Sequence, residues 1–510
     1  MDNRALWEPT APKRRLVLLC LLVTGAVLRL WGVGAKSLWV DEINAVMMSE
    51  TFEQLMRNSI AGHEPPVRLM IVWLLQKGPP VDLLVRLPAA IFGTLTIVLM
   101  LRIGRRLWDW PTGLAAAGLL LLSPWHVLHS QDARYYAMIL FLALAALELA
   151  LRIVERPRPL APWLALGIVC ALNLYISYVA SLAILPLAAW LLWHMAKAWR
   201  RPDEEAQLRW YLRGGALATA VILVAFLPWL QVLARVARQY TGLEAPVVAR
   251  PQRLVWETPY NWPYWMSYVA TLGVQHWLVK WALAAFVAIG LVRSWFHARS
   301  IFLLAIFWFV LPWAIILTTG VRYFTPPRYL IHYLGLYLLL AGAGAVWTWD
   351  LLAGRVRAIG GAFARRAART LLYGAAGLLG AVVFLAFARE VILYHRIGKQ
   401  DWKGVVRYLD RHVDPTREVV LAGGSWTERG LRYYWRDMQQ PPLLIERRVH
   451  PSEILYELQV RPNVWYVTWG PMLPETAQLL AQRFELVERF PGFEGEVWVL
   501  RTRREGTGNG

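Results

Sequence analysis

The sequence predicts an all-α polytopic membrane protein that carries a small α/β domain at its C-terminal end. Hydrophobic residues make up 57% of the 510-residue chain and charged residues only 17%, whereas about a quarter is usual for charged residues in soluble domains. Apolar runs near the length that crosses a bilayer, about 17 to 25 residues, recur from Leu16 to Ala388. After Glu390 the pattern changes to short alternating helices and strands.

About eleven apolar segments can be drawn before residue 390. They cover residues 15–33, 84–103, 112–124, 135–152, 161–177, 180–196, 214–233, 277–293, 300–318, 328–348 and 371–388. The segment HEPPVRLMIVWLLQKG (His63 to Gly78) has too short an apolar run to cross and contains Arg68. We expect it to form a helix at the membrane interface.

The distribution of basic residues predicts the topology. With segment 63–78 excluded from the spans, the basic loops all fall on the side of the N-terminal basic residues, as the positive-inside rule requires. These groups are Lys13, Arg14 and Arg15; Arg102, Arg105 and Arg106; Arg152, Arg156 and Arg158; Lys197, Arg200 and Arg201; Arg293 and Arg299; and Arg355, Arg357, Arg365, Arg366 and Arg369. We therefore expect a multi-pass protein of the inner (cytoplasmic) membrane with a cytoplasmic N-terminus. The outer loops would be residues 34–83, 123–134, 234–276 and 319–328.

The domain prediction follows from this topology: a membrane domain at 1–390, an extracytoplasmic α/β domain at 391–502 and a disordered tail at 503–510. In the α/β domain, helices are expected at 401–413, 425–436 and 451–460, and strands at 417–424, 441–446 and 463–470. No Gly-rich phosphate loop follows a strand, so no nucleotide is expected. The two cysteines, Cys20 and Cys170, lie in predicted spans and exclude a disulfide framework.

The net charge of +20 does not indicate nucleic acid, because the basic residues lie mostly in short loops between apolar segments. They suit the lipid bilayer, its anionic head groups and phosphates.

The outer loops gather ionisable residues that are costly near a membrane and are usually kept there because they pair or act. The set mixes acids, imidazoles and guanidiniums, which suits transfer of a group from a phosphate-bearing lipid to a hydroxyl. A carboxylate would take the proton of the acceptor, and cations would hold the departing phosphate. Its members are Asp41, Glu42, His63, Glu64, Arg86, His126, His129, Asp132, Arg134, Arg322 and Arg328.

Structural interpretations of these residues stay open. Asp41 suits the N-cap of a helix that begins at Glu42, and Arg86 and Arg134 suit snorkelling to the interface. His126 and His129 suit interfacial hydrogen bonds or, less often, metal binding. Asp132 suits an ion pair with Arg134 or Arg328. A transporter or flippase of lipid-linked sugars and a non-catalytic subunit are the competing classes. The acids in outer loops and the lack of a visible repeat favour an enzyme.

Six motifs in order resemble the GT-C membrane glycosyltransferases, near the bacterial relatives of protein O-mannosyltransferases and of the lipid A aminoarabinose transferase. They are SLWVDEINAVMMS, HEPPVRLMIVW, RLPAAIFGTLTIVLMLRIGRRLW, LLSPWHVLHSQDARYYAMILFLALAALELALR, PPRYLIHYLGLYLLLAGAG and DWKGVVRYLDRHV. The resemblance implies a polyprenyl-phosphate sugar donor, a glycan, lipid or protein acceptor, and inversion at the anomeric carbon.

The resemblance also implies roles for single residues. Asp41 matches the catalytic aspartate that acts as general base, Glu42 matches the second acid of the pair, and Asp132 matches a further acidic position. Arg86, Arg134 and Arg328 are the candidates for the lipid phosphate, and His63, Glu64, His129 and Arg322 complete the predicted substrate-binding set. The chain reads HEPP where many relatives read HPP, which adds Glu64 near the predicted site. No cofactor is indicated, and a divalent cation at Asp41, Glu42 or Asp132 is neither indicated nor excluded by their spacing.

Overall fold

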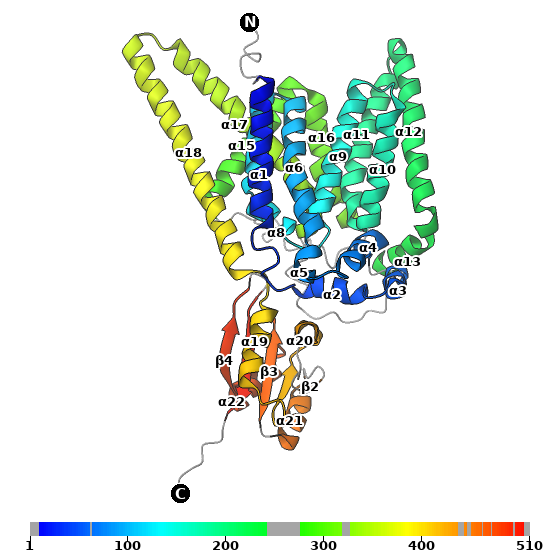
Figure 1. Cartoon of the computed structure of the whole chain (residues 1–510). Helices are drawn as coiled ribbons and strands as arrows, with labels where there is room; N and C mark the ends of the chain where they lie inside the picture. Colours follow the sequence, from blue (N-terminus) through cyan, green and yellow to red (C-terminus); the bar gives the residue numbers. More distant parts are fainter. Residues whose placement is uncertain are drawn as a thin grey trace. The chain divides into compact units, whose positions relative to one another are not determined.

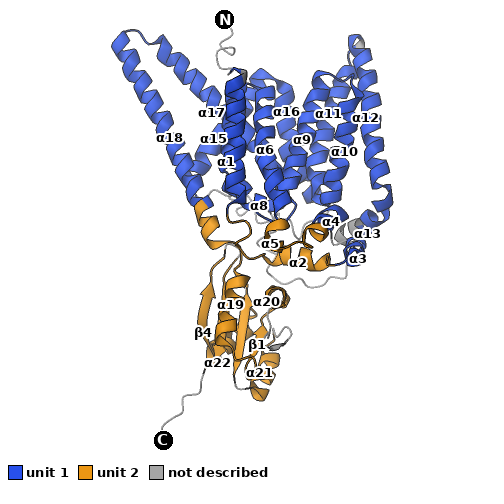
Figure 2. Cartoon of the chain, in the orientation of Figure 1, with its two compact units in different colours: residues 1–31, 51–71, 86–391 blue, residues 32–50, 72–85, 392–510 orange. Residues whose placement is uncertain are grey.

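The computed structural model describes residues 10–61, 64–241, 276–318, 327–436, 443–445, 450–461, 463–470, 472–492 and 495–503. The chain divides into two compact units (Figure 2). Unit 1 comprises residues 1–31, 51–71 and 86–391, and unit 2 comprises residues 32–50, 72–85 and 392–510. Two helices, α4 and α18, begin in unit 1 and end in unit 2.

Unit 1 is a bundle of helices (Figure 1). In chain order its helices are α1 (Ala11–Leu30), α3 (Phe52–Ile60), α4 (Pro66–Leu75), α6 (Leu87–Leu107), α7 (Trp110–Leu122), α8 (Pro124–Ser130), α9 (Tyr136–Glu155), α10 (Leu160–Ile176), α11 (Ser181–Trp199), α12 (Glu205–Phe226), α13 (Leu230–Thr241), α15 (Trp277–His297), α16 (Arg299–Thr318), α17 (His332–Ala358) and α18 (Ala362–Ile397). Short 3₁₀ turns join some of them: η2 (Tyr178–Ala180), η3 (Pro202–Glu204), η4 (Leu227–Trp229) and η6 (Pro327–Leu330).

The membrane character predicted from the sequence is confirmed, although the number of spans differs. In the part of the chain that the structure describes, eight helices are long and apolar enough to cross a membrane, or nine if α7 and α8, which are bent by 61° relative to each other, form one span. The sequence predicts about eleven. The two remaining predicted segments are helices as well, but α10 has only 17 residues and α1 carries basic residues at both ends. Helix α4, with ten residues, is too short to cross.

The loops that follow α6, α9, α11, α15 and α17 lie at the end of unit 1 where α1 begins, at the top of Figure 1. These loops and the adjoining helix ends contain the basic groups that the sequence predicts on one side. The opposite end of the bundle carries α3, α8 and α13 and the beginnings of α9 and α17. Which end faces the cytoplasm stays a prediction.

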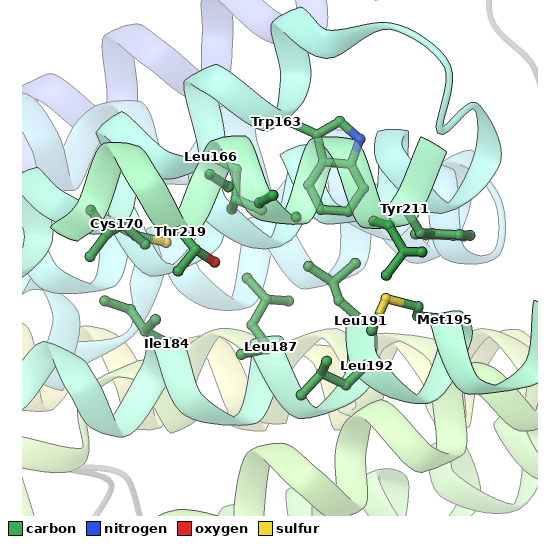
Figure 3. Close-up of a pocket in the computed structure, with 16 residues that line it drawn as sticks. Trp163, Leu166, Cys170, Ile184, Leu187, Leu191, Leu192, Met195, Tyr211 and Thr219 are labelled. Atoms are coloured by element: carbon green, nitrogen blue, oxygen red, sulfur yellow. The ribbon is translucent and has the colours of Figure 1, made fainter. Parts of the chain in front are cut away.

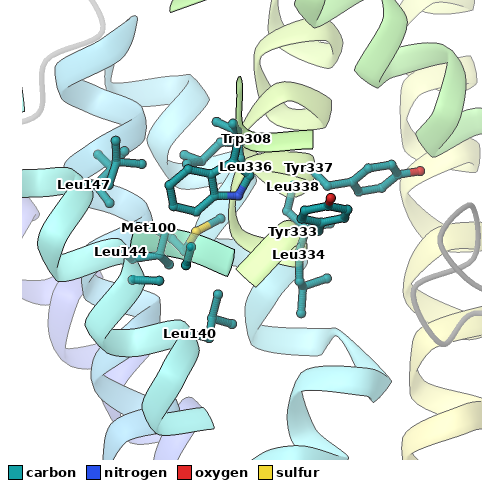
Figure 4. Packing of buried hydrophobic residues seen from close by; sticks show 14 of the residues in the cluster. Met100, Leu140, Leu144, Leu147, Trp308, Tyr333, Leu334, Leu336, Tyr337 and Leu338 are labelled. Carbon is teal, nitrogen blue, oxygen red and sulfur yellow. The ribbon is translucent and has the colours of Figure 1, made fainter. Parts of the chain in front are cut away.

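The core of unit 1 is built around α9 and α17. Met100, Leu144, Trp308 and Leu336 lie among the buried side chains there (Figure 4). In the apolar stretch of α9, 72% of the residues are buried. This helix is therefore surrounded mostly by protein rather than lipid.

Small residues allow some helices to approach closely. A Cβ atom added at Gly104 of α6 would lie 2.6 Å from the Cα of Gly113 in α7, and one added at Gly344 of α17 would collide with the Phe286 carbonyl in α15. Close backbone approach through glycine is the usual way in which membrane helices gain packing contacts, since lipid removes the hydrophobic driving force.

Unit 2 contains a five-stranded mixed sheet in the order β2-β1-β3-β5-β4. Its strands are β1 (Val419–Ala422), β2 (Leu443–Ile445), β3 (Val464–Trp469), β4 (Phe484–Phe490) and β5 (Val497–Thr502). Strand β1 pairs in parallel with β2 and β3, whereas β5 pairs antiparallel with β3 and β4. The helices of the unit are α2 (Val40–Met48), α5 (Val81–Leu84), α19 (Trp402–His412), α20 (Ser425–Trp435), α21 (Pro451–Val460) and α22 (Pro474–Arg483).

The predicted α/β domain is therefore confirmed, with each of its six predicted helices and strands present. The sequence analysis did not assign α22, β4 and β5. These elements complete the sheet after residue 470, and they follow a stretch whose alternation is weak, because five consecutive residues of β4 are exposed.

The interpretation of Asp41 as an N-cap is wrong. Helix α2 begins two residues earlier than predicted, at Val40, with Trp39 in the N-cap position. The carboxylate of Glu42 accepts the backbone N–H of Trp39 at 3.0 Å, so Glu42 satisfies one of the N–H groups that a helix start leaves without a partner.

Candidate active site

Glu64 joins two arginines at the end of unit 1 opposite the basic loops. It lies just before α4, and its Oε1 accepts from Nη1 of Arg134 at 2.7 Å, while its Oε2 accepts from the guanidinium of Arg68. Arg68 also donates to the carbonyl oxygen of Ala133 at 3.2 Å. We call Glu64, Arg68 and Arg134 the Glu64 cluster.

The Glu64 cluster is buried and carries a net positive charge. The side chains of Arg68, Arg134 and Glu64 are 2%, 10% and 16% exposed. Burial alone would raise the pKa of the Glu64 carboxyl, but the Arg68 and Arg134 guanidiniums reverse this effect and hold that pKa below its usual range. One carboxylate thus holds two guanidiniums in fixed positions, and guanidiniums that are fixed in this way suit an anion.

Aromatic rings connect the Glu64 cluster to Arg328. The guanidinium of Arg134 lies 4.9 Å from the ring centroid of Tyr135, and Nε of Arg328 donates to the hydroxyl of Tyr136 at 3.0 Å. The rings of Tyr135 and Tyr136 meet edge to face with centroids 4.8 Å apart. His129 contacts the other side of Tyr136, also at 4.8 Å. The structure therefore brings four predicted residues, Glu64, His129, Arg134 and Arg328, into one connected group.

Asp132 belongs to the same turn between α8 and α9. It is 1% exposed, and its Oδ2 lies 3.8 Å from Nδ1 of His129.

Arg86 precedes the first residue of α6 and is 4% exposed. Arg86 and Arg134 are thus buried rather than extended into the surroundings, which argues against snorkelling for both.

Two residues that the sequence analysis did not single out connect α1 to its neighbours, Arg29 to α7 and α8 and Gln131 to this turn. Arg29, which is fully buried, donates to the carbonyl oxygen of Leu120 at 3.3 Å and lies 2.7 Å from Nδ1 of His126. Gln131 donates to the carbonyl oxygens of Leu28, Arg29 and Trp31 at the end of α1. The only sequence signal for Arg29 was a basic residue in the last turn of an apolar segment. A side chain that snorkels to the membrane interface gives the same pattern.

Unit 2 holds Asp41 and Glu42, the adjacent acids of the first predicted outer loop. Glu42 is fully buried and caps α2, whereas Asp41 is half-buried. Of the two adjacent carboxylates, Asp41 is therefore the more accessible. His63 and Arg322 lie outside the described residues, as do most of the predicted loop 234–276 and residues 319–326 of the predicted loop 319–328.

A pocket of about 360 Å³ lies among α10, α11 and α12 (Figure 3). Its lining is apolar and includes Trp163, Leu166, Leu187 and Ile222. It offers no charged side chain to a sugar or a phosphate, so we exclude it as the reaction site.

Within the described residues, no group of three or more His, Cys, Asp or Glu side chains is arranged to hold a metal ion.

Part of this chain matches the model of a known protein family, and its fold is similar to that of solved structures. The family model of dolichyl-phosphate-mannose-protein mannosyltransferase matches residues 63–231. The apo crystal structure of ArnT from Cupriavidus metallidurans is similar over 96% of this chain and 98% of its own, with a TM-score of 0.56 and 14% sequence identity. The chain therefore has the fold of ArnT, and residues 63–231 match the mannosyltransferase family model.

A second solved structure shares the fold of this chain. The oligosaccharyltransferase AglB from Archaeoglobus fulgidus, solved with an inhibitory peptide and a dolichol-phosphate, is similar over 89% of this chain and 69% of its own, with a TM-score of 0.53 and 11% identity. No curated protein sequence matches the chain significantly. The predicted resemblance and the predicted fold class are thus confirmed. The family match includes the Glu64 cluster, Arg86, His129 and Asp132, whereas Asp41 and Arg328 lie outside it.

Proposed function

We propose that this chain is a glycosyltransferase that moves a sugar from a polyprenyl-phosphate donor to a hydroxyl group of a glycan, lipid or protein. Transfer would take place on the outer face of the cytoplasmic membrane and invert the anomeric carbon. The donor class is supported by a second crystal structure of ArnT from Cupriavidus metallidurans, which was solved with undecaprenyl phosphate bound and has a TM-score of 0.53 and 15% identity to this chain.

The observation that carries this proposal is the pair of buried guanidiniums, Arg68 and Arg134, that Glu64 holds in place. Polyprenyl phosphate leaves with its negative charge, and guanidiniums that are already held in place stabilise that charge without reorganising during the reaction. Glu64 provides the fixed arrangement, since each of its oxygens binds one guanidinium. Arg328 would add a third guanidinium through Tyr136. We assign the phosphate to Arg134 and Arg328.

We assign the proton to Asp41. The oxygen of the acceptor hydroxyl attacks the anomeric carbon, the bond from that carbon to the phosphate oxygen breaks, and the hydroxyl proton passes to the Asp41 carboxylate. Because Glu42 is committed to the Trp39 N–H, Asp41 is the better candidate of the two. A single displacement of this kind inverts the anomeric carbon. Asp132 and His129 would act as a buried pair that holds the turn carrying Arg134.

The outer-face assignment rests on the distribution of charge within unit 1. The basic loops lie at one end of the bundle, and α8 and the beginning of α9 lie at the other. The positive-inside rule assigns the basic end to the cytoplasm. The turn that contains Asp132 and Arg134 then belongs to the outer end.

The first experiment measures transfer of radiolabelled sugar from a small panel of polyprenyl-phosphate sugars to membrane extract, with native protein and Asp41→Asn. We expect transfer by the native protein and a loss of about 10²- to 10⁴-fold in the variant, as for removal of a general base. Undiminished transfer by Asp41→Asn would refute its role as the base. Binding of the lipid by both proteins with transfer by neither would favour a transporter.

A further inference from the structure

The segment that leads into α19, residues 399–403 (Lys-Gln-Asp-Trp-Lys), lies along the loop that precedes α2. Both belong to unit 2, although they are some 360 positions apart in the chain. The Oε1 of Gln400 accepts the backbone N–H of Val40 at 3.0 Å and the Nε1–H of Trp402 at 2.8 Å. Val40 is the first residue of α2, so Gln400 binds the helix start directly beside Asp41.

The orientation of the Gln400 amide is determined by these two contacts. Both partners are donors, so the oxygen has to face them. Gln400, Val40 and Trp402 are 2%, 3% and 0% exposed. Water therefore cannot replace the amide oxygen easily, and loss of that oxygen would leave the buried Val40 N–H without a partner.

A second set of contacts holds the loop two residues before Trp39. The hydroxyl of Ser37 donates to Oδ1 of Asp401 at 3.2 Å and accepts the backbone N–H of Lys403 at 2.8 Å. Asp401 is itself fixed, because the same Oδ1 accepts the N–H of Gly404 at 2.9 Å and caps α19.

The lysines of the segment add two more contacts. The ammonium group of Lys399 lies 3.9 Å from the ring centroid of Trp39, and that of Lys403 pairs with Asp82 at 2.7 Å. Asp82 also accepts from the hydroxyl of Tyr434 in α20 at 3.0 Å. Cation–π contacts gain strength when the partners are desolvated, and Lys399 and Trp39 are only 7% and 5% exposed.

We propose that residues 399–403 position Asp41 for the reaction, so that the C-terminal part of the chain contributes to turnover by holding the start of α2. This inference rests on the proposed role of Asp41 as the base. Gln400 is the central positioning residue and Ser37 supports it. Neither residue is assigned a contact with substrate. The rate depends on the placement of the base, and a displacement of about 1 Å can cost about 100-fold.

The test compares Gln400→Leu and Ser37→Ala with Gln482→Leu, which changes an exposed glutamine of α22 in the same unit. The full-length proteins transfer labelled sugar from a polyprenyl-phosphate sugar of the panel to membrane extract. For Gln400→Leu we expect kcat to fall about 10- to 100-fold with the donor KM unchanged within about twofold. The kcat of Ser37→Ala should fall less than that of Gln400→Leu, and the kcat of Gln482→Leu should match that of the native protein.

Two further measurements separate positioning from general stabilisation. Hydrogen exchange should become faster in residues 38–48 of Gln400→Leu, even without substrate. In an Asp41→Asn background, Gln400→Leu should cause little additional loss, because a residue that acts through Asp41 has no effect once the base is gone. If Gln400→Leu fails to fold, Ser37→Ala decides the question by the same three measurements.

The inference is overturned if both variants keep the native kcat per folded molecule, or if Gln400→Leu causes the same loss with and without Asp41. An Asp41→Asn protein that transfers like the native one would instead refute the base assignment itself. The two failures are therefore distinguishable.

Discussion

Unit 1 contains two glutamates that each bind more than one arginine, at opposite ends of the bundle. Glu64 binds Arg68 and Arg134, whose side chains are 2% and 10% exposed. Glu148 of α9 is buried like Glu64, but its partners Arg102, Arg106 and Arg152 are 51%, 26% and 40% exposed. The same residue types thus form a desolvated cluster at one end and a hydrated one at the other.

Both clusters contain ion pairs, but only the arginines of the Glu64 cluster are buried. Burial of the arginines, rather than the presence of ion pairs, therefore distinguishes a candidate site from charged residues at the membrane interface. Arginines that reach water lose little when their partner is removed, because water hydrates them. Buried arginines depend on their partner and keep a fixed geometry. Only the second kind provides a prearranged positive charge for a departing phosphate.

The largest expected effect comes from removing the two glutamates. Glu64→Ala leaves two buried guanidiniums without a counter-charge and should cost about 3–5 kcal/mol of stability. Glu148→Ala, the matched control, should cost about 1 kcal/mol because its arginines are hydrated. Thermal unfolding of the purified proteins in detergent measures both. Equal losses of stability in the two variants would show that burial of the arginines does not distinguish the two clusters.

Removal of one arginine from each cluster tests function. Arg134→Ala should lower the rate of sugar transfer about 10²- to 10³-fold, since it deletes a group that stabilises the leaving phosphate. Arg102→Ala should leave transfer close to native, because Arg102 lies at the other end of the bundle and is half exposed. The radiolabel assay with a polyprenyl-phosphate sugar compares them. A normal rate for Arg134→Ala would contradict its assignment to the phosphate.

The smallest expected effect concerns pH. In the folded protein, burial raises the pKa of the Glu64 carboxyl, but Arg68 and Arg134 outweigh this effect. They hold that pKa below its usual range. Its stabilising contribution is therefore present above the unfolded pKa of about 4.3 and is lost as pH falls through the lower folded value. The melting temperature of native protein should exceed that of Glu64→Gln at neutral pH, and the gap should narrow below about pH 4. A gap that is independent of pH would show that the charge of Glu64 is irrelevant.

Particular residues show how far prediction from the sequence reached. Glu64, Arg134, His129 and Arg328 were chosen from the sequence, and the structure connects them. Arg68 was noted only as a charge inside a short apolar run, because no pattern links it to Arg134 at a distance of 66 positions. The helix start at Val40 was missed by two residues, since Asp41 satisfies the usual N-cap preference while Trp39 does not.

The residue order contains enough information for the membrane class, most helix positions, the α/β end of the chain and the family resemblance. Apolar length, hydrophobic periodicity and ordered motifs are local properties of the chain, so they can be recognised without contacts. Which arginines share one carboxylate, and that residues 399–403 hold the start of α2, required the folded chain. Those pairings join positions far apart in sequence, and their strength depends on how completely folding removes them from water.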